Sequence, residues 1–583
     1  MAVRTVLFNI EALQDRLIAQ RVKFAKRKHD AVILAGYTKD KSQPKKKNTK
    51  AQARFREDLR IFRKIMPSRR SWVHLDEKSR YGGKQNCRIT SIDQNKKALE
   101  LTFKRDCKNA AEYMLLQKNV LRGLRKQILR RKYEFSEPKI SGTIKNKKEL
   151  RPVCSFPIFD NIILQECNRI LSTWFDPYFC ASSYAFRVKY EHKKAPTHHD
   201  TILKILEYLS MHQGETIYVA ECDLQKFFDT INHERIISCF ANFLEQVPKP
   251  KSEKRMLEHL FFSYLRCYDY QKSVKPLNSN QEFLKKAKNR RFVWIKEELL
   301  LEKYGEAYSE QEIGVPQGGA LSGLIANIVL HQVDYALEQL NDSDLLYLRF
   351  CDDMIMLHTN ETDLNVAFSL YQEKLNENLL FIHEPKMIKD YSSQYYKVKS
   401  KAPFAFGPLD EGKIPWITFV GYDISHLKEV RVRKSTVEKQ IKKQEEVVGK
   451  VIRTVKESER PIERKKTIES VRSRLIGMSV GRIVLWEDNA IKEMCWAKGF
   501  PCLTKNPYSI RQIKRLDRSR AKQIDRLYKK LPPDIVHDKD KDNDPQDKPK
   551  GKRKHKNRPI IYYGKPFSYY YWLEKKDEES NGK

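Results

Sequence analysis

The stretch Leu-Tyr-Leu-Arg-Phe-Cys-Asp-Asp-Met-Ile-Met-Leu, residues 346–357, decides the fold. Two short apolar runs rich in β-forming side chains flank Asp352 and Asp353, a pattern that is typical of a tight hairpin with buried arms. Both carboxylates then lie at the tip, where they could hold a divalent metal ion. Because two aspartates are also ordinary turn residues, this interpretation needs support from the rest of the chain.

Two other segments give that support. The β-like run 216–223 ends on Asp223 and is followed by a predicted helix start near residues 232–234. The Gly/Pro loop 314–322, Gly-Val-Pro-Gln-Gly-Gly-Ala-Leu-Ser, opens a helix with apolar residues at spacings of three and four. A strand carboxylate, a glycine loop before a helix and a double carboxylate on a hairpin suit nucleotidyl transfer with two metal ions, because carboxylates from separate strands must hold both ions.

In this order the motifs resemble those of the reverse transcriptases, RNA-directed DNA polymerases with fingers, palm and thumb. The resemblance runs from about residue 140 to about residue 430 with every motif in sequence order. The matching positions are Lys145 with Arg151 and Pro152, the segment 183–187, Asp223, Phe228, Gln317-Gly318-Gly319 with Ser322, Phe350-Cys351-Asp352-Asp353, Lys386, and the segment 419–422.

The resemblance implies a role for each matching residue. Asp223, Asp352 and Asp353 are expected to be the catalytic residues and, with the backbone carbonyl of Leu224, the ligands of two Mg²⁺ ions, for which Mn²⁺ can substitute. Phe228 is expected to disfavour a ribose hydroxyl, which implies deoxynucleotides. The other expected dNTP-binding residues are Lys145, Arg151, Gln317, Gly318 and Lys386, and the expected primer grip is Phe419, Gly421 and Tyr422.

Alternatives exist for several of these residues. Lys147 and Lys148 compete with Lys145 for the triphosphate, and Lys386 could be an ordinary surface lysine instead of a proton donor to pyrophosphate. Glu221 and Asp229, which flank the strand of Asp223, are interpreted as structural or supporting residues. The adjacent His198 and His199 have no Cys or His partner at ligand spacing and are interpreted as surface residues.

The sequence also departs from the family pattern. It reads Phe-Cys-Asp-Asp where most relatives have Tyr-Ala-Asp-Asp, and it lacks the signatures of retron enzymes and the endonuclease cysteines of intron maturases. The group II intron-like, defence-associated and abortive-infection reverse transcriptases remain. We therefore expect synthesis on a dedicated non-coding RNA, in antiphage defence. The alternatives are template-independent deoxynucleotide polymerisation and a non-catalytic RNA-binding scaffold.

Composition points to a polyanionic partner. The 583 residues include 113 Lys and Arg against 75 Asp and Glu, a formal net charge of +38, and such an excess favours nucleic acid through counterion release. We expect an RNA template, a DNA product and dNTPs as partners. Because no apolar run approaches the roughly 20 residues of a spanning helix and no signal peptide is seen, we expect no membrane partner and a cytoplasmic location. Eleven scattered cysteines predict no zinc site.

The predicted fold class is α+β: a right-hand polymerase with an antiparallel palm sheet packed on helices, a helical thumb, a basic helical N-terminal extension and a mobile C-terminal tail. Helices are expected at 3–28, 54–66, 110–133 and 161–174, and basic helices at 435–486 with a break at Pro461. The aromatic tail is expected to dock as a strand or to stack on bases. The predicted domains are 1–105 (extension), 106–215 (fingers, hairpin 141–155), 216–430 (palm, insertion 269–308 without an assigned role), 431–531 (thumb and C-terminal helices) and 532–583 (charged linker and tail).

Overall fold

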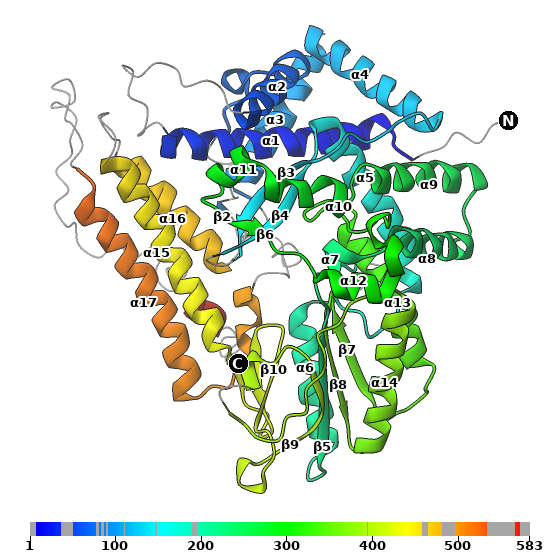
Figure 1. Ribbon diagram of the computed structural model, residues 1–583. Coiled ribbons are helices and arrows are strands. Elements are labelled where there is room, and N and C mark those ends of the chain that lie inside the picture. Colours follow the sequence, from blue (N-terminus) through cyan, green and yellow to red (C-terminus); the bar gives the residue numbers. More distant parts are fainter. Residues whose placement is uncertain are drawn as a thin grey trace, which may run out of the picture.

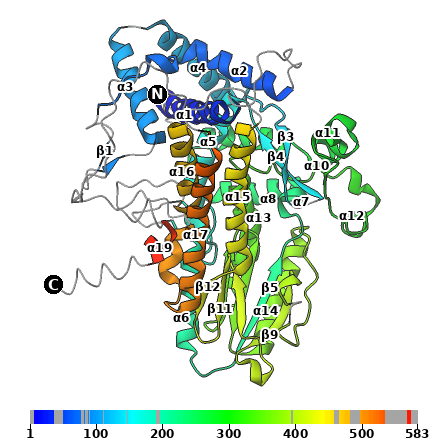
Figure 2. The same ribbon diagram turned by 90° about the vertical axis from the view of Figure 1, so that its left-hand side faces the viewer.

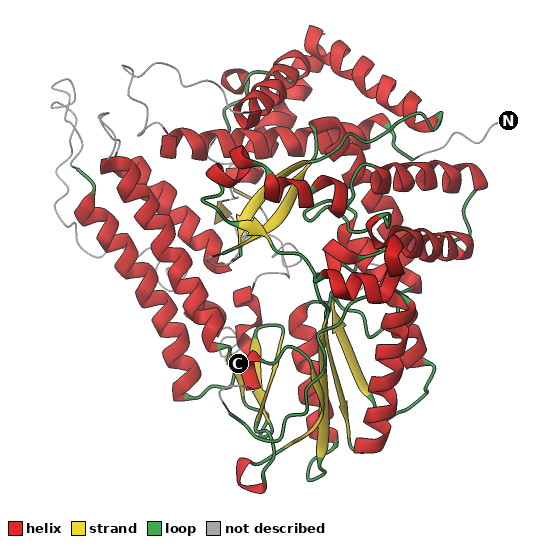
Figure 3. Cartoon of the chain, in the orientation of Figure 1, coloured by secondary structure: helices red, strands yellow, loops and turns green. Residues whose placement is uncertain are grey.

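The computed structural model describes residues 7–35, 50–76, 81–82, 87–88, 91–109, 111–145, 148–188, 195–392, 395–456, 464–480, 496–532 and 566–571. Helices surround four small sheets (Figure 3). The predicted α+β class is therefore confirmed. No helix among these residues has both the length and the apolar character required to cross a bilayer.

The palm is a four-stranded antiparallel sheet with the strand order β7-β8-β5-β9. Alternate side chains point to opposite faces of each strand, and both faces are covered. Val219, Leu348 and Ile355 pack on α6, whereas Ala220 and Met354 lie in the core that includes α13 and α14. The bounds are β5 (Ile217–Asp223), β7 (Leu346–Phe350), β8 (Asp353–His358), β9 (Lys401–Phe406), α6 (His198–Met211), α13 (Ser322–Glu338) and α14 (Glu361–Glu377).

The fingers contain the predicted hairpin, with β3 (Lys139–Ile144) antiparallel to β4 (Glu149–Ser155). A third strand, β6 (Arg291–Phe292), joins β4 in parallel and comes from the insertion 269–308, for which the sequence predicts no role. The other helices of fingers and palm are α5 (Ile158–Phe175), α7 (Phe227–Thr230), α8 (His233–Gln246), α9 (Lys251–Arg266), α10 (Tyr270–Ser273), α11 (Gln281–Lys286) and α12 (Glu297–Tyr304). Short 3₁₀ helices lie at 69–71, 176–178, 275–279, 305–309, 395–397 and 409–411.

The N-terminal extension is helical, as predicted, with shifted boundaries. It contains α1 (Ile10–Ala35), α2 (Lys50–Ile65) and α3 (Ser91–Lys108), with two short paired strands, β1 (Tyr81–Gly82) and β2 (Cys87–Arg88). Next, α4 (Glu112–Leu129) replaces the predicted helix 110–133. These helices run across the top of Figure 1, where α1 packs on α3, α4 and α5. The low-complexity segment 42–49 lies outside the described residues.

The thumb begins with a three-stranded sheet of β10 (Trp416–Phe419), β11 (Tyr422–Ser425) and β12 (Val430–Val432). The helices α15 (Lys434–Lys456), α16 (Arg464–Val480) and α17 (Pro507–Lys530) follow and lie side by side in both ribbon views (Figures 1 and 2). The expected break at Pro461 and the linker 533–559 lie outside the described residues.

The aromatic tail contributes a helix, not the expected strand. Residues 566–571 form α19 (Pro566–Tyr571), which contacts α17 and the 3₁₀ helix Trp496–Cys502. Phe567 and Tyr571 are buried, and the Asp517 carboxylate accepts hydrogen bonds from the backbone N–H and the hydroxyl of Ser568 at 3.0 and 2.6 Å. Docking is therefore confirmed for this segment. The predicted strand form is wrong for residues 566–571, which form a helix that satisfies backbone hydrogen bonds within itself.

Candidate active site

The palm sheet brings together aspartates that are 130 residues apart in the sequence. β5 and β8 are antiparallel neighbours, and their register sets Asp223 directly opposite Asp353. Asp352 precedes Asp353 in the turn between β7 and β8. Cys351 takes a left-handed backbone conformation in this turn, with φ 64°, which tightens the reversal of the chain. The hairpin predicted from residues 346–357 and its approach to Asp223 are both confirmed.

Negative charge accumulates at this meeting point. Although the Asp353 side chain is exposed overall, burial and the nearby Asp352 and Asp223 carboxylates raise the pKa of Asp353 to about 7. The ammonium group of Lys399 partly neutralises Asp223, because Lys399 Nζ lies 2.9 Å from Asp223 Oδ2. His383 Nε2 lies 3.7 Å from the same oxygen. Burial lowers the pKa of His383.

The chemistry of these residues suits Mg²⁺, which prefers oxygen ligands and is commonly held by one or two carboxylates. The Asp352 and Asp223 carboxylates help to raise the pKa of Asp353, and a divalent cation would neutralise the negative charge that these groups share. Within the part of the chain that the structure describes, no group of three or more His, Cys, Asp and Glu side chains is arranged to hold an ion as it stands. The ligand set Asp223, Asp352 and Asp353 therefore stays a prediction, as does the carbonyl of Leu224, a residue whose backbone pairs with Ile382.

A buried ion pair stabilises the turn that carries Asp352 and Asp353. The Arg349 guanidinium on β7 donates to both oxygens of Asp334 on α13, at 2.7 and 2.5 Å, and both side chains are almost fully buried. The same guanidinium donates to the Cys351 carbonyl at 2.9 Å and to Ser183 Oγ at 2.8 Å. Because Cys351 lies next to Asp352, Arg349 fixes the turn that carries the carboxylates.

The glycine loop lies between the palm and the fingers. Gln317 Nε2 donates to Asp229 Oδ1 at 2.6 Å, and the Gln317 carbonyl accepts from the Cys154 N–H of β4 at 2.8 Å. Gly318 has φ 88°, a conformation that favours glycine. A Cβ at Gly319 would lie 2.1 Å from the Tyr264 hydroxyl, so no larger residue fits there without displacing Tyr264. Burial raises the pKa of Asp229 to about 6, whereas the hydrogen bond from Gln317 opposes the shift.

Residues 143–395 match the family described as reverse transcriptase (RNA-dependent DNA polymerase). This region is a reverse transcriptase domain. It accounts for less than half of the 583 residues. The predicted reverse transcriptase family is confirmed for residues 143–395, and the subfamily stays a prediction.

The chain is also similar, at low sequence identity, to individual proteins and solved structures. The group II intron-encoded protein LtrA of Lactococcus lactis subsp. cremoris is 26% identical over 197 residues, which are 34% of this chain and 24% of that protein. The chain thus matches about a quarter of the length of this relative. Among solved structures, apo telomerase from Candida tropicalis is 12% identical with a TM-score of 0.33 and covers 90% of this chain and 94% of that chain. The RNA-dependent RNA polymerase of a human picobirnavirus is 8% identical with a TM-score of 0.35 and covers 67% and 57%. These TM-scores are too low to support an argument.

Several of the residues predicted to select and bind the nucleotide lie near the glycine loop of the reverse transcriptase domain. Phe228 on α7 is half-buried and contacts Phe227, and its carbonyl accepts from the Val315 N–H of the loop at 2.8 Å. Arg151 on β4 is exposed opposite Thr143. Lys145, 46% exposed, lies 3.7 Å from Glu149.

A third cation, Lys226, joins Lys145 and Arg151 near the glycine loop. Burial lowers the pKa of Lys226, and Lys145 and Arg151 add to this shift, so the three positive charges lie within electrostatic reach of one another. Lys226 was not predicted, because nothing in the sequence around it distinguishes it from an ordinary turn lysine. Its backbone is left-handed, with φ 52°.

Lys386 is exposed, and its backbone pairs with Ser400 and Ala402 beside β9. Lys399, on the same strand connection, is the lysine that reaches Asp223. No feature of the sequence 397–401, Lys-Val-Lys-Ser-Lys, separates Lys399 from its neighbours, so the contact could be found only from the fold. The role of Lys386 stays a prediction.

The predicted primer grip forms a hairpin between β10 and β11, with Phe419 paired to Tyr422. Both aromatic rings are buried in the thumb-side core, so the turn at Val420 and Gly421 is the part that remains for contact with a primer. Val420 and Gly421 have φ values of 41° and 90°, which close the two-residue loop. Gripping itself stays a prediction.

The prediction that His198 and His199 are surface residues is wrong. They form the first turn of α6, where His199 is 8% exposed, and the ring of His198 lies near those of Phe350 and Tyr422. Burial lowers the pKa of His198 to about 4. The pair thus joins the catalytic hairpin to the predicted primer grip, and the apolar surroundings that bury it come from residues more than 150 positions away.

Proposed function

We propose that the chain is an RNA-directed DNA polymerase that extends a 3′-hydroxyl with dNTPs by nucleotidyl transfer with two metal ions. One observation carries the proposal: the register that sets Asp223 opposite Asp353, beside the turn of Asp352. The match of residues 143–395 to the reverse transcriptase family agrees with it. A scaffold that had lost its activity would have no need to keep three carboxylates in one repulsive cluster.

Asp223, Asp352 and Asp353 would hold Mg²⁺, with Mn²⁺ as a substitute. Bound there, the metal would supply charge stabilisation and a lowered pKa for the attacking hydroxyl. Residues of the chain itself would hold the surrounding turn and loop in place. Arg349 holds the turn through the Cys351 carbonyl, and Gln317 fixes the glycine loop on Asp229.

Three cations near the glycine loop would bind the triphosphate. Arg151 can bind phosphate oxygens through two N–H groups at once, and Lys145 and Lys226 add charge at the same place. Phe228 would exclude a ribose 2′-hydroxyl, so the substrates would be deoxynucleotides.

The template would be RNA, which the net charge of +38 supports. A dedicated non-coding RNA, a role in antiphage defence and a cytoplasmic location are parts of this proposal that rest on the family resemblance and the composition. Template-independent addition of deoxynucleotides is the second candidate, because the same carboxylates would serve it.

The test is to purify the protein with the RNA that it retains, to add Mg²⁺ with either the dNTPs or the NTPs, and to sequence the RNA and the product. DNA complementary to the retained RNA is the expected result. Homopolymeric or unrelated DNA would favour the template-independent candidate, and RNA product would contradict the proposal. The variant Asp352→Asn with Asp353→Asn should retain the RNA and lose synthesis, and retained synthesis would refute the site.

A further inference from the structure

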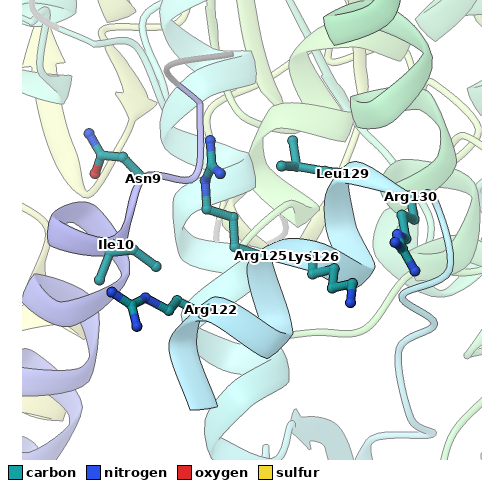
Figure 4. Close-up of a pocket in the computed structure, with 7 residues that line it drawn as sticks. All are labelled: Asn9, Ile10, Arg122, Arg125, Lys126, Leu129 and Arg130. Atoms are coloured by element: carbon teal, nitrogen blue, oxygen red, sulfur yellow. The ribbon is translucent and has the colours of Figure 1, made fainter. Parts of the chain in front are cut away.

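A pocket on the outer side of the fingers, between the start of α1 and the last two turns of α4, collects positive charge. It has a volume of about 530 Å³ and is lined by Asn9, Ile10, Arg122, Arg125, Lys126, Leu129 and Arg130. Figure 4 shows Arg122 directed toward Ile10, with Arg125 and Lys126 about one turn further along α4 and Arg130 just after its last residue. We call these residues the α1–α4 pocket.

Three of the four cations in this pocket have no acidic partner among the residues that the structure describes. Arg122, Lys126 and Arg130 are exposed and form no ion pair with any residue that the structure describes. At a rise of about 1.5 Å per residue, they form a row about 12 Å long. The helix dipole favours cations only in the last turn, so it does not explain Arg122, which lies two turns earlier.

Both walls of the pocket are fixed by packing. At the start of α1, Phe8 is 1% exposed, and Asn9 Oδ1 accepts from the Ala12 N–H at 2.7 Å. On the other wall, Gln117 is buried and connects α4 to α1 and α2, through Gln14 at 2.8 Å and the Ile65 carbonyl at 2.8 Å. The backbone positions that carry the cations are therefore set before any ligand binds, which lowers the entropy cost of binding.

A row of exposed cations, held on one helix and without an ion pair among the described residues, suits a polyanion with regularly spaced charges. We propose that the α1–α4 pocket binds the phosphate backbone of a structured RNA, outside the catalytic cleft. The proposal rests on the proposed function, because an enzyme that copies a dedicated RNA must hold the folded part of that RNA away from the copied strand. Arginine can bind phosphate through two parallel N–H groups, and three of the four cations that line the pocket are arginines.

An anionic membrane surface is the competing partner, and the packing of α4 argues against it. An interfacial helix buries its apolar face in the lipid. The apolar residues Leu121 and Ile128 of α4 are instead buried inside the protein. Leu129, 38% exposed, is the exposed leucine of the pocket lining, and the more exposed Leu115 and Leu116 lie near the other end of α4. RNA therefore fits this surface better than lipid.

The test measures binding of the full chain to a fluorescein-labelled RNA hairpin at several salt concentrations. The pocket variant carries Arg122→Gln, Lys126→Gln and Arg130→Gln. Each lost phosphate contact should lower the slope of log affinity against log salt by about 1, and affinity should fall about tenfold or more.

The matched control removes three exposed cations elsewhere: Lys249→Gln, Lys251→Gln and Arg255→Gln near the start of α9. It should bind the hairpin nearly as the wild type does. A second pocket variant, Arg122→Lys with Arg130→Lys, keeps the charge and should keep most of the affinity, which separates charge loss from misfolding. Equal loss in the pocket and control variants, or wild-type affinity in the pocket variant, would overturn the proposal.

Two further measurements separate the explanations. Extension of a short primer–template duplex should be unchanged in the pocket variant, because the pocket lies outside the catalytic site. If the wild type fails to extend that duplex, the proposed function fails, whereas the hairpin measurement still decides the pocket. Binding to phosphatidylserine vesicles should be weak for all variants. Loss of vesicle binding with unchanged RNA affinity in the pocket variant would assign the pocket to a membrane and refute the proposal.

Discussion

Replacing Arg349 by methionine should destabilise the palm strongly. The change removes one partner of an ion pair whose side chains are 0% and 1% exposed, and breaking such a pair costs about 3–5 kcal/mol because the remaining charge stays buried. Asp334 would keep only the hydroxyl of Tyr347, at 2.8 Å. The Cys351 carbonyl would lose its donor, so the aspartate turn should loosen and DNA synthesis should fall as well.

Amide hydrogen exchange of peptides from β7 and β8, followed by mass spectrometry, reports this region directly. A loss of about 3 kcal/mol corresponds to exchange about a hundredfold faster in the most protected amides. The double variant Arg349→Met with Asp334→Asn leaves no buried charge and should recover at least half of the lost protection. The control Lys204→Met removes an exposed ion pair with Glu207 and should change exchange little. Unchanged protection in Arg349→Met, or a double variant as weak as the single one, would refute the reasoning.

Three other variants test separate parts of the structure. Phe228→Ala should raise the incorporation of ribonucleotides relative to deoxynucleotides in a primer-extension assay, and an unchanged sugar preference would remove its gating role. Because burial lowers the pKa of His198 to about 4, the folded state resists protonation, so the free energy of unfolding should fall as pH drops from about 6.5 to about 4. Urea titrations should show a smaller decline for His198→Phe, and an identical decline would contradict the assignment. Asp517→Ala removes the acceptor for Ser568 and should release α19 to limited proteolysis at a cost of about 1–3 kcal/mol, whereas Asp525→Ala on the exposed side of α17 should not.

The sequence predicted the central part of the site because its signals are local. Apolar runs around Asp223 and around Asp352–Asp353 predict strands, and the glycine loop before an apolar helix predicts the neighbouring element. The register that joins these segments follows from the burial of both sheet faces, since a shift of one residue would turn the apolar side chains of β5 and β8 away from their cores.

Contacts between distant segments gave no such signal. Lys399 looks like the lysines around it until β9 pairs with β5 and brings it to Asp223. Arg349 reads as a charged residue inside an apolar strand, and its partner Asp334 lies on another element. The aromatic tail predicts docking as a strand or stacking on bases, but residues 566–571 form a helix whose first N–H groups donate to a carboxylate on α17.

The parallel pairing of β6 with β4 has a mechanical consequence. The segment that ends in β6 starts from the palm, where the Tyr270 N–H donates to the Ile313 carbonyl, and then reaches across to Arg291 beside Glu149. Residues 270–291 therefore connect the palm to the fingers hairpin. A movement of the fingers hairpin relative to the palm would therefore have to carry residues 271–290 along or bend them.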